Sequence, residues 1–321
     1  MREEELSYCR RVRLAGTTCE ARSNSENFLR MLRACAEDAR QDESVGLSLD
    51  VRVNHDCLEK PGKQHFRGSQ HIVAASFGSH TVFVFDLLRG HIGAVVSQAS
   101  ACDQDFWTFT ILPLAIGIMA PAMGILPVHC ACLVDHGDGL LVAGASGAGK
   151  STLSASMCAS GFDYLADDWT YLRCDRGVLG AYGARARIKL MPDAVRHFPS
   201  LIAHPLRPAM NGELAREVDA ARDLSARVIT CCSPRWLLLL HRSPEPGFKF
   251  APEESQTVRR YLQGNMEPLP AEIWNLERQR ALLLDRIAQL PCWRFTYGGS
   301  PQFATQVLSE FVRQRRGGLC A

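Results

Sequence analysis

The segment Gly144-Ala-Ser-Gly-Ala-Gly-Lys-Ser151 is the feature that most constrains this chain, because its glycines and its Lys-Ser pair have the Walker A spacing. The short apolar run at 140–143 predicts a buried parallel strand before it, and apolar residues at helical spacing over 152–160 predict a helix after it. Gly161 predicts the end of that helix. Glycines let backbone N–H groups turn toward a phosphate, and the helix start adds about half a positive charge. The segment therefore predicts a phosphate-binding loop.

The residues of this loop have separate expected roles toward ATP and Mg²⁺. Lys150 is expected to reach the β- and γ-phosphate oxygens, and the Ser151 hydroxyl is expected to ligate Mg²⁺. The predicted nucleotide-binding residues are Gly144, Ser146, Gly147, Gly149, Lys150, Ser151 and Thr152. A Gly/Ala/Ser turn that fits the pattern by chance is the alternative. The order of strand, loop, Lys-Ser pair and helix favours nucleotide binding.

Two acidic residues follow the next apolar segment. Residues 162–166 predict a strand, and the pair Asp167-Asp168 ends it. Because ligands of doubly wound sheets bind at the carboxyl ends of the strands, these acids are expected to face the bound phosphates. One acid can hold Mg²⁺, and the other can take a proton from an attacking hydroxyl. An Asp-Asp turn that caps the following segment is the alternative interpretation.

The loop and the acidic pair together resemble the catalytic domain of the HPr kinase/phosphorylase family. In that family the loop runs Gly-x-Ser-Gly-x-Gly-Lys-Ser, and the next strand ends in Ala-Asp-Asp after a glycine. Here Lys150 lies eleven positions before Gly161 and seventeen before Asp167, which is the family's register. The family also has a histidine fifteen positions before the first loop glycine, and His129 stands there. The related ATP-dependent PEP carboxykinases share the continuation Lys150-Ser-Thr-Leu-Ser154.

This resemblance covers about residues 125–300 and is specific only from His129 to Asp168. HPr kinases usually carry acids at the second loop position and just after Lys-Ser, where this chain has Ala145 and Thr152. Their second glycine-rich signature, linked to the phosphorylase direction, has no clear copy over 177–194. The resemblance therefore supports a kinase of this fold and leaves its substrate open.

The resemblance implies an α/β fold, with a P-loop core of the HPr kinase/PEP carboxykinase type and an N-terminal antiparallel β-rich region. The expected domains are an N-terminal α+β region at 1–108 and a kinase catalytic domain at 109–321. The implied reaction transfers the γ-phosphoryl group of ATP to a Ser or Thr hydroxyl of a small protein or peptide, HPr-like or a peptide natural-product precursor. A small-molecule kinase on the same fold and a non-catalytic nucleotide-binding switch remain open.

The catalytic residues implied by the resemblance are Lys150, His129 and Asp167. Asp167 would accept the proton of the acceptor hydroxyl, and Asp168 would act with Ser151 on the Mg²⁺ side. Consecutive residues that leave a strand point in different directions, so the two carboxylates are expected to have different roles. The order of these roles rests on the resemblance alone. His129 is expected near the transferred phosphate, and a structural core histidine is the alternative.

Three basic residues alternate further along the chain, at Arg185, Arg187 and Lys189. A positive group beside the γ-phosphate would offset the charge that develops as the phosphoryl group moves. All three are therefore candidates for contacts to phosphate or substrate. Basic side chains on a solvated edge strand would give the same pattern, and the sequence does not separate the two interpretations.

Composition and charge argue against several other classes of protein. The chain is 46% apolar and 22% charged, which is ordinary for a soluble globular protein. A net charge of +2 from intermixed residues gives no electrostatic footprint for nucleic acid or an anionic membrane. The apolar run at 111–128 is interrupted by Pro113, Pro121 and Pro127, so we expect a buried helix and turn there rather than a membrane span.

The thirteen cysteines come with no signal peptide and no Cys-x-x-Cys pair. We therefore expect reduced, buried thiols in a cytoplasmic protein. A metal site made of His129, Cys130 and Cys132 is disfavoured, because Cys-x-Cys on a strand supplies too few ligands. A homo-oligomer is left open by the sequence.

Other segments outside the motif region have simpler patterns. Residues 25–40 predict a helix, and alternating segments over 45–97 predict an antiparallel β region. Residues 203–230 are expected to form a loop with little core of its own. The remaining predicted elements are a central strand at 235–242, helices at 252–263 and 271–289, a last strand at 292–297 and a terminal helix at 302–316.

Overall fold

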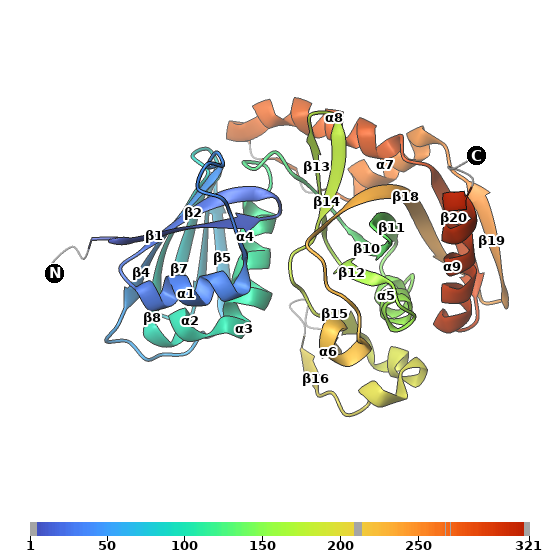
Figure 1. The fold of residues 1–321 in the computed structure, drawn as a ribbon, viewed down its shortest axis with the longest axis horizontal. Helices are drawn as coiled ribbons and strands as arrows, with labels where there is room; N and C mark the ends of the chain where they lie inside the picture. The colour runs from blue at the N-terminus through green and yellow to red at the C-terminus, as the bar shows by residue number, and fades with distance from the viewer. Residues whose placement is uncertain (1–4, 209–213, 267, 270, 318–321) are drawn as a thin grey trace. The chain divides into compact units, whose positions relative to one another are not determined.

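The computed structural model describes residues 5–208, 214–266, 268–269 and 271–317. The chain forms two compact units, one from Met1–Leu126 with Glu267–Leu282 and the other from Pro127–Met266 with Leu283–Ala321. Helices and β-sheets of both parallel and antiparallel pairing occur together in the described residues (Figure 1). The chain is therefore a mixed α/β protein, as its sequence predicts.

The first unit is built on an eight-stranded sheet in the order β3-β1-β2-β4-β8-β7-β6-β5. Along β4, side chains alternate between buried and more exposed positions, as a strand with one face against a core requires. The strands are β1 (Tyr8–Leu14), β2 (Thr17–Ser23), β3 (Glu37–Asp38), β4 (Leu47–Asn54), β5 (Gln64–Ser69), β6 (Ile72–Phe77), β7 (Val82–Asp86) and β8 (His91–Ser97). The pattern of the sequence thus identified β4, β6, β7 and β8, but it missed β1, β2, β3 and β5.

The prediction of an antiparallel region is wrong for the centre of this sheet. β4 pairs in parallel with both β2 and β8. Parallel neighbours need a crossover connection, and α1 (Glu26–Cys35) supplies one between β2 and β4. Between β4 and β8, the antiparallel strands β5, β6 and β7 bring the chain back. The alternation that predicts a strand carries no information about its direction.

Helix α1 packs against β1 and β2 in this unit. Ser25 caps its start by accepting a hydrogen bond from the Phe28 N–H at 3.3 Å. The buried Phe28 ring lies 4.8 Å, centroid to centroid, from the ring of Trp107. The helix ends at Cys35 instead of near residue 40, because the next residues pair with β1 as β3.

The apolar run after residue 106 forms helices and a turn, as predicted. It contains η1 (Trp107–Ile111), α4 (Leu112–Met119) and, after a turn, β9 (Leu126–Val128). Because α4 packs on β7, residues 109–126 group with the first unit, whereas the predicted catalytic domain begins at 109. Across the described ranges, no helix is both long enough and apolar enough to span a membrane. The remaining helices that lie wholly in this unit are α2 (Gln98–Cys102), α3 (Gln104–Phe106) and η4 (Ala271–Leu276).

The second unit contains a nine-stranded sheet whose main path runs β12-β10-β11-β18-β14-β13-β9. β20 pairs with β18 beside this path, and β19 pairs with β20. Apart from β9, the strands are β10 (Cys130–Asp135), β11 (Asp138–Gly144), β12 (Asp163–Ala166), β13 (Thr170–Asp175), β14 (Val178–Tyr182), β18 (Cys231–Arg242), β19 (Gly247–Pro252) and β20 (Cys292–Gly298). β18 has neighbours on both sides and is the predicted central strand.

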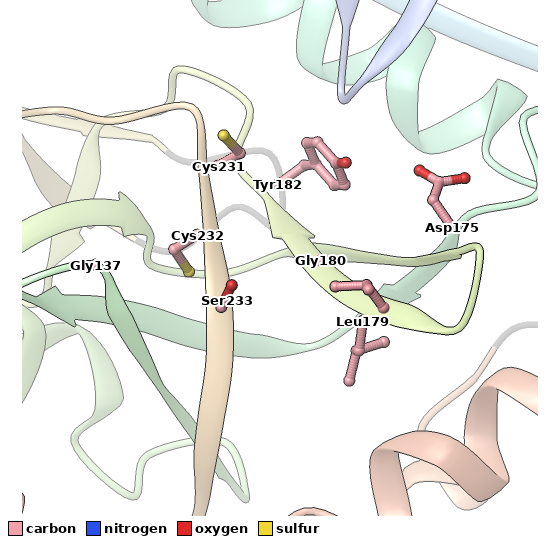
Figure 2. A pocket seen from close by; sticks show the side chains of 9 residues that line it. Gly137, Asp175, Leu179, Gly180, Tyr182, Cys231, Cys232 and Ser233 are labelled. Atoms are coloured by element: carbon pink, nitrogen blue, oxygen red, sulfur yellow. The ribbon is translucent and has the colours of Figure 1, made fainter. Parts of the chain in front are cut away.

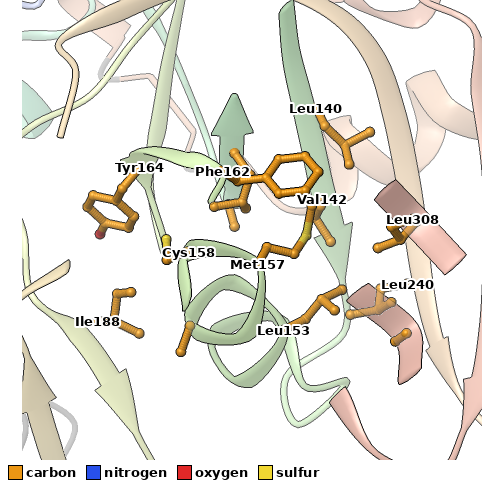
Figure 3. Close-up of a cluster of buried hydrophobic side chains, with 14 of the residues drawn as sticks. Leu140, Val142, Leu153, Met157, Cys158, Phe162, Tyr164, Ile188, Leu240 and Leu308 are labelled. Atoms are coloured by element: carbon orange, nitrogen blue, oxygen red, sulfur yellow. The ribbon is translucent and has the colours of Figure 1, made fainter. Parts of the chain in front are cut away.

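Helix α5 (Lys150–Ala159) is buried within the second unit. Leu153 and Met157 are each 0% exposed and belong to one core cluster with Val142 of β11. Leu308, on α9 (Pro301–Gly317), packs in the same cluster (Figure 3). The predicted strand and helix on either side of the glycine-rich segment are therefore confirmed. Gly161, with φ 99°, follows the helix as predicted.

The prediction of a loop over 203–230 is wrong in part. Two strands of this stretch, β16 (Leu206–Pro208) and β17 (Leu214–Val218), form a three-stranded sheet with β15 (Ile188–Leu190), and α6 (Ala220–Leu224) follows. Ala215 and Val218 of β17 are buried, and Val218 belongs to the core cluster around α5. Residues 209–213 of the predicted loop lie outside the described residues. The other helices are η2 (Pro192–His197), η3 (Pro199–Leu201), α7 (Ser255–Gly264) and α8 (Glu277–Ala288), and α8 has residues in both units.

Candidate functional site

Three strands of the second unit end at the same edge of its sheet. β11 and β12 each pair antiparallel with β10, so they run in the same direction, and β18 runs parallel to β11. The glycine-rich loop at 145–149 follows the end of β11, and Asp167 follows the end of β12. Ligands of α/β sheets bind outside the carboxyl ends of the strands. The topology therefore brings the loop and the acidic pair together, as the sequence predicts.

Two glycines let the backbone of this loop make close approaches. Gly149 precedes α5 with φ 91°, and a Cβ there would lie 3.2 Å from the Tyr297 hydroxyl. A Cβ at Gly144 would lie 2.9 Å from the carbonyl oxygen of Leu240. A larger residue would strain the first position and clash at the second. Among the other predicted loop residues, Ser146 and Gly147 are exposed, and Ser151 and Thr152 are half-buried.

The Lys150 ammonium group lies inside the loop. Its Nζ atom donates hydrogen bonds to the carbonyl oxygens of Gly144 at 2.8 Å and Ala145 at 3.4 Å. The residue is only 8% exposed. Burial lowers the pKa of Lys150, while the negative charges of Asp168 and Asp167 act in the opposite direction. A buried cation whose direct contacts here are neutral carbonyls is well suited to bind an anion.

Asp167 is buried, with 4% of its surface exposed. Burial raises the pKa of its carboxyl group to about 6, although hydrogen bonds from the Ser151 hydroxyl and the Lys189 backbone lower it. Its Oδ1 atom is buried and has no hydrogen-bond partner among the described residues. A buried, incompletely satisfied carboxylate is costly, which is typical of a site that binds a ligand.

Asp168 forms a pair with His129. The His129 Nε2 atom lies 2.9 Å from Asp168 Oδ1, and the Asp168 side chain is 51% exposed. Burial alone would raise the pKa of Asp168, but the hydrogen bond and charge of His129 and the positive charges of Lys189 and Lys150 lower it. The Thr170 hydroxyl donates to the carbonyl oxygen of Cys130 at 2.8 Å and so joins the two segments that carry the pair.

The three predicted basic residues have different surroundings. The positive charge of Lys189 lowers the pKa of Asp168, and a hydrogen bond from the Lys189 backbone lowers the pKa of Asp167. Arg187 instead pairs with Glu217 at 3.1 Å, and Arg185 is exposed. The structure therefore brings Lys189 to the acidic pair, and it gives Arg187 a local partner.

Arg242 and Tyr297 also lie at this edge, and the sequence analysis missed both. They are near the ends of the parallel strands β18 and β20. The Arg242 guanidinium lies over the Tyr297 ring, 4.4 Å from its centroid, and donates to the Gly299 carbonyl oxygen at 3.2 Å. A Cβ at Gly149 would lie 3.9 Å from the Arg242 side chain. An arginine that ends a central apolar strand is the sequence signal that marks this position.

The residues at this edge fit ATP and Mg²⁺. The Asp167 carboxylate and the Ser151 hydroxyl are hard oxygen donors of the kind that Mg²⁺ prefers, and the Ser151 hydroxyl lowers the pKa of Asp167. The unpartnered Oδ1 of Asp167 has the capacity for one more interaction. Lys150 and the start of α5 supply positive charge for phosphate groups.

A separate hollow of about 350 Å³ lies at the other end of these strands. Figure 2 shows its lining by Tyr182, Cys232 and Ser233, near the starts of β11 and β18. β11 has seven residues, and a rise of about 3.3 Å per residue puts roughly 20 Å between its two ends. This hollow is therefore not part of the glycine-rich loop and its acidic pair.

The described cysteines are all free thiols, as predicted. Cys130 and Cys132 are buried, and burial raises the pKa of the Cys130 thiol to about 12. Cys132 Sγ lies 3.7 Å from Cys232 Sγ. The prediction that the thiols are buried is wrong for Cys9, Cys102 and Cys231, which are exposed.

The fold and the edge described above define a mixed α/β protein with a glycine-rich strand–loop–helix segment beside an acidic pair. No protein-family model matches the chain, and no curated protein sequence matches it. Among solved structures, the chain is similar to the Hpr(Ser) kinase/phosphatase from Coxiella burnetii. The identity is 14% and the TM-score 0.33, over 61% of this chain and 99% of the other. At so low a TM-score, nothing about the fold, the site or the reaction follows from the likeness.

Proposed function

We propose that this chain is an ATP-dependent kinase that transfers the γ-phosphoryl group to a Ser or Thr hydroxyl of a small protein or peptide. The observation that carries the proposal is the buried Asp167 Oδ1 atom, which has no hydrogen-bond partner among the described residues and follows β12 at the sheet edge that carries the glycine-rich loop. The Ser151 hydroxyl, at the start of α5, lowers the pKa of the same carboxyl group. Lys150 and the Asp168–His129 pair complete a set that can bind phosphate and accept a proton.

Mg²⁺ would be held by Ser151 and Asp167, and when bound it would neutralise charge on the β- and γ-phosphate oxygens. This assignment reverses the order of roles that the resemblance implies for the two aspartates. Its first support is the Asp167 Oδ1 atom, which is buried and has no hydrogen-bond partner among the described residues. Its second support is access, because Asp167 is 4% exposed and an acceptor hydroxyl cannot approach so deeply buried a carboxylate.

Asp168 is then the base that accepts the proton of the acceptor hydroxyl. Half of its side chain is exposed, so an acceptor on a protein or peptide can reach it. Its hydrogen bond to His129 orients the carboxylate and keeps it anionic. The raised pKa of Asp167 in the ligand-free protein suits a base better than the lowered pKa of Asp168. A bound Mg²⁺ would lower the pKa of Asp167, however, so we assign the two roles by access.

The proposed step balances as an in-line displacement. The acceptor oxygen forms a bond to the γ-phosphorus, and the bond between the γ-phosphorus and the β–γ bridging oxygen breaks, so that ADP leaves. Asp168 takes the proton from the acceptor oxygen. Lys150 and Lys189 offset the negative charge that is redistributed among the phosphoryl oxygens. Their charges act on the acidic pair in the ligand-free protein, which supports these roles.

The test is a transfer assay with γ-labelled ATP and Mg²⁺ against panels of proteins, peptides and metabolites, which includes products of neighbouring genes. Label on a serine or threonine of a protein or peptide that depends on Asp168 and Lys150 supports the proposal. Label only on a metabolite would make the chain a small-molecule kinase. Binding of Mg²⁺–ATP without transfer to any acceptor would make it a nucleotide-binding switch.

A further inference from the structure

Three side chains of the first unit form a cluster of metal-binding groups outside the proposed kinase site. Cys57 and Glu59 follow β4, and His80 lies in the turn between β6 and β7. Their donor atoms, one from each residue, all lie within 4.8 Å of one another. Thiolate, imidazole and carboxylate are all established zinc ligands. Glu59 and His80 are exposed and Cys57 is half-buried, so an ion can enter from solvent.

The backbone that carries Cys57 and Glu59 is fixed at the end of β8. The Gln98 N–H donates to the Cys57 carbonyl oxygen at 2.8 Å. The Ser97 hydroxyl donates to the Glu59 carbonyl oxygen at 2.6 Å. Ser97 is 0% exposed, so the donor side of this second bond is buried. The backbone at Cys57 and Glu59 is therefore held by two consecutive residues, Gln98 and Ser97.

The turn that carries His80 is hydrogen-bonded to the same segment, at Ser97 and Ser100. The hydroxyl of Thr81, the next residue, lies 2.8 Å from the hydroxyl of Ser100, and it also accepts a hydrogen bond from the Ser97 N–H at 3.4 Å. Thr81 and Ser100 are buried. These buried hydroxyls fix the spacing between the two loops, which is the kind of outer support that metal sites need.

The distance between two of the donor atoms matches a shared ion. His80 Nε2 and Glu59 Oε2 lie 3.4 Å apart. Bonds of about 2.0–2.1 Å to a tetrahedral zinc ion put nitrogen and oxygen ligands about 3.3 Å from one another. A direct charge-assisted hydrogen bond would be shorter, at about 2.7–2.9 Å. The absence of a side chain at Gly78 also leaves room for the Glu59 carboxylate, since a Cβ there would lie 3.0 Å from Glu59 Oε1.

We propose that Cys57, Glu59 and His80 bind one divalent transition-metal ion, with zinc as the expected metal, and that water takes the fourth position. A thiolate and an imidazole favour zinc over Mg²⁺ or Ca²⁺, which prefer oxygen ligands. The Cys57 thiol must lose its proton to bind, so zinc affinity falls as pH falls. This site is independent of the kinase proposal, because none of its residues belongs to the glycine-rich loop or the acidic pair.

The first experiment titrates the metal-free full chain with Zn²⁺ alone and with Co²⁺ as a spectroscopic substitute. The expected result is one tight equivalent of Zn²⁺ per chain. The Co²⁺ form should show a thiolate-to-cobalt charge-transfer band, together with the strong visible bands of tetrahedral cobalt. Absence of the thiolate band in the wild-type chain would overturn the proposal, whatever any variant does.

The second experiment compares ligand variants with matched controls. Cys57→Ser, Glu59→Gln and His80→Ala should each weaken zinc binding by more than about 100-fold, beyond the ~10–100-fold typical of outer partners. Cys57→Ser should also abolish the thiolate band. The controls are Cys9→Ser and His65→Ala, which change an exposed cysteine of β1 and an exposed histidine of β5 and should retain the tight equivalent. Retention of that equivalent in Cys57→Ser and His80→Ala would refute the site.

Discussion

His129 Nε2 lies 2.9 Å from Asp168 Oδ1, while Oδ1 of the neighbouring Asp167 is buried and has no hydrogen-bond partner among the described residues. Two consecutive acids thus have different surroundings, since Asp168 is half-exposed and paired and Asp167 is buried. The strand that precedes them explains the difference, because successive side chains along an extended backbone point in opposite directions. The pair is therefore suited to two separate tasks in phosphoryl transfer.

Substitution of each aspartate should have a different effect. Asp168→Asn removes the proposed base and should lower the transfer rate by about 10²–10⁴-fold, with Mg²⁺–ATP affinity retained. Asp167→Asn should instead raise the Mg²⁺ concentration needed for half-maximal activity. Transfer rates measured over a Mg²⁺ titration separate the two. Exchanged phenotypes would restore the order that the sequence resemblance implies, and two fully active variants would remove the pair from the mechanism.

Loss of the loop lysine should weaken nucleotide binding without unfolding the chain. Lys150→Ala removes a cation whose contacts are two loop carbonyls, and charge-assisted contacts to phosphate oxygens are lost with it. ATP-analogue titration, with and without Mg²⁺, should show a sharp fall in affinity, and turnover should fall with it. Wild-type affinity and turnover in this variant would exclude phosphate binding by the loop.

Folding stability of the ligand-free protein should depend on Asp167 between about pH 4 and pH 6. Burial raises the pKa of Asp167 to about 6, above the ~3.9 expected for an unfolded chain. In this window the folded state keeps a proton that the unfolded chain has lost, so this contribution is present below pH 4 and is lost as pH rises through 6. The difference corresponds to about 3 kcal/mol.

Asp167→Asn carries no such charge and should therefore be more stable than the wild type at pH 7, with a smaller difference at pH 4. Urea unfolding of both proteins at several pH values, with EDTA present, measures the two stability curves. Parallel curves for the wild type and the variant would show that Asp167 does not titrate in this way.

Arg242 should contribute to nucleotide binding from the end of the central strand. Arg242→Ala removes a guanidinium group that stacks on Tyr297 beside Gly149, so the affinity for Mg²⁺–ATP should fall. Arg235→Ala is the matched control, because Arg235 is an exposed arginine near the start of the same strand and pairs with Asp138. Equal affinities for the two variants would contradict the assignment.

The contact between α5 and α9 should be a main determinant of stability in the second unit. Leu308 is 0% exposed in the core cluster around α5, so Leu308→Ala should lower the free energy of unfolding by about 2–5 kcal/mol. Leu282→Ala changes a leucine that is 60% exposed and should cost less than about 0.5 kcal/mol. Urea unfolding gives both values, and a small loss for Leu308→Ala would contradict the packing described here.

The sequence by itself determined the elements whose signals are local. Strand, glycine-rich loop and helix around Lys150 form as the spacing of apolar residues and glycines predicts. The strand before Asp167 is equally local, since a short apolar segment ends in polar residues. Such patterns report which residues a segment buries and where its backbone turns, and both follow from neighbouring residues alone.

Only the tertiary structure decided which segments meet. The parallel pairing of β4 with β2 and β8, and the burial of β17, depend on partners far away in the chain. The same holds for Arg242 at the glycine-rich loop and for the cluster of Cys57, Glu59 and His80. Side-chain periodicity fixes which face of a strand is buried, but it does not fix the strand's direction or its neighbours. Those depend on the packing of the whole chain, which places each side chain among residues distant in sequence.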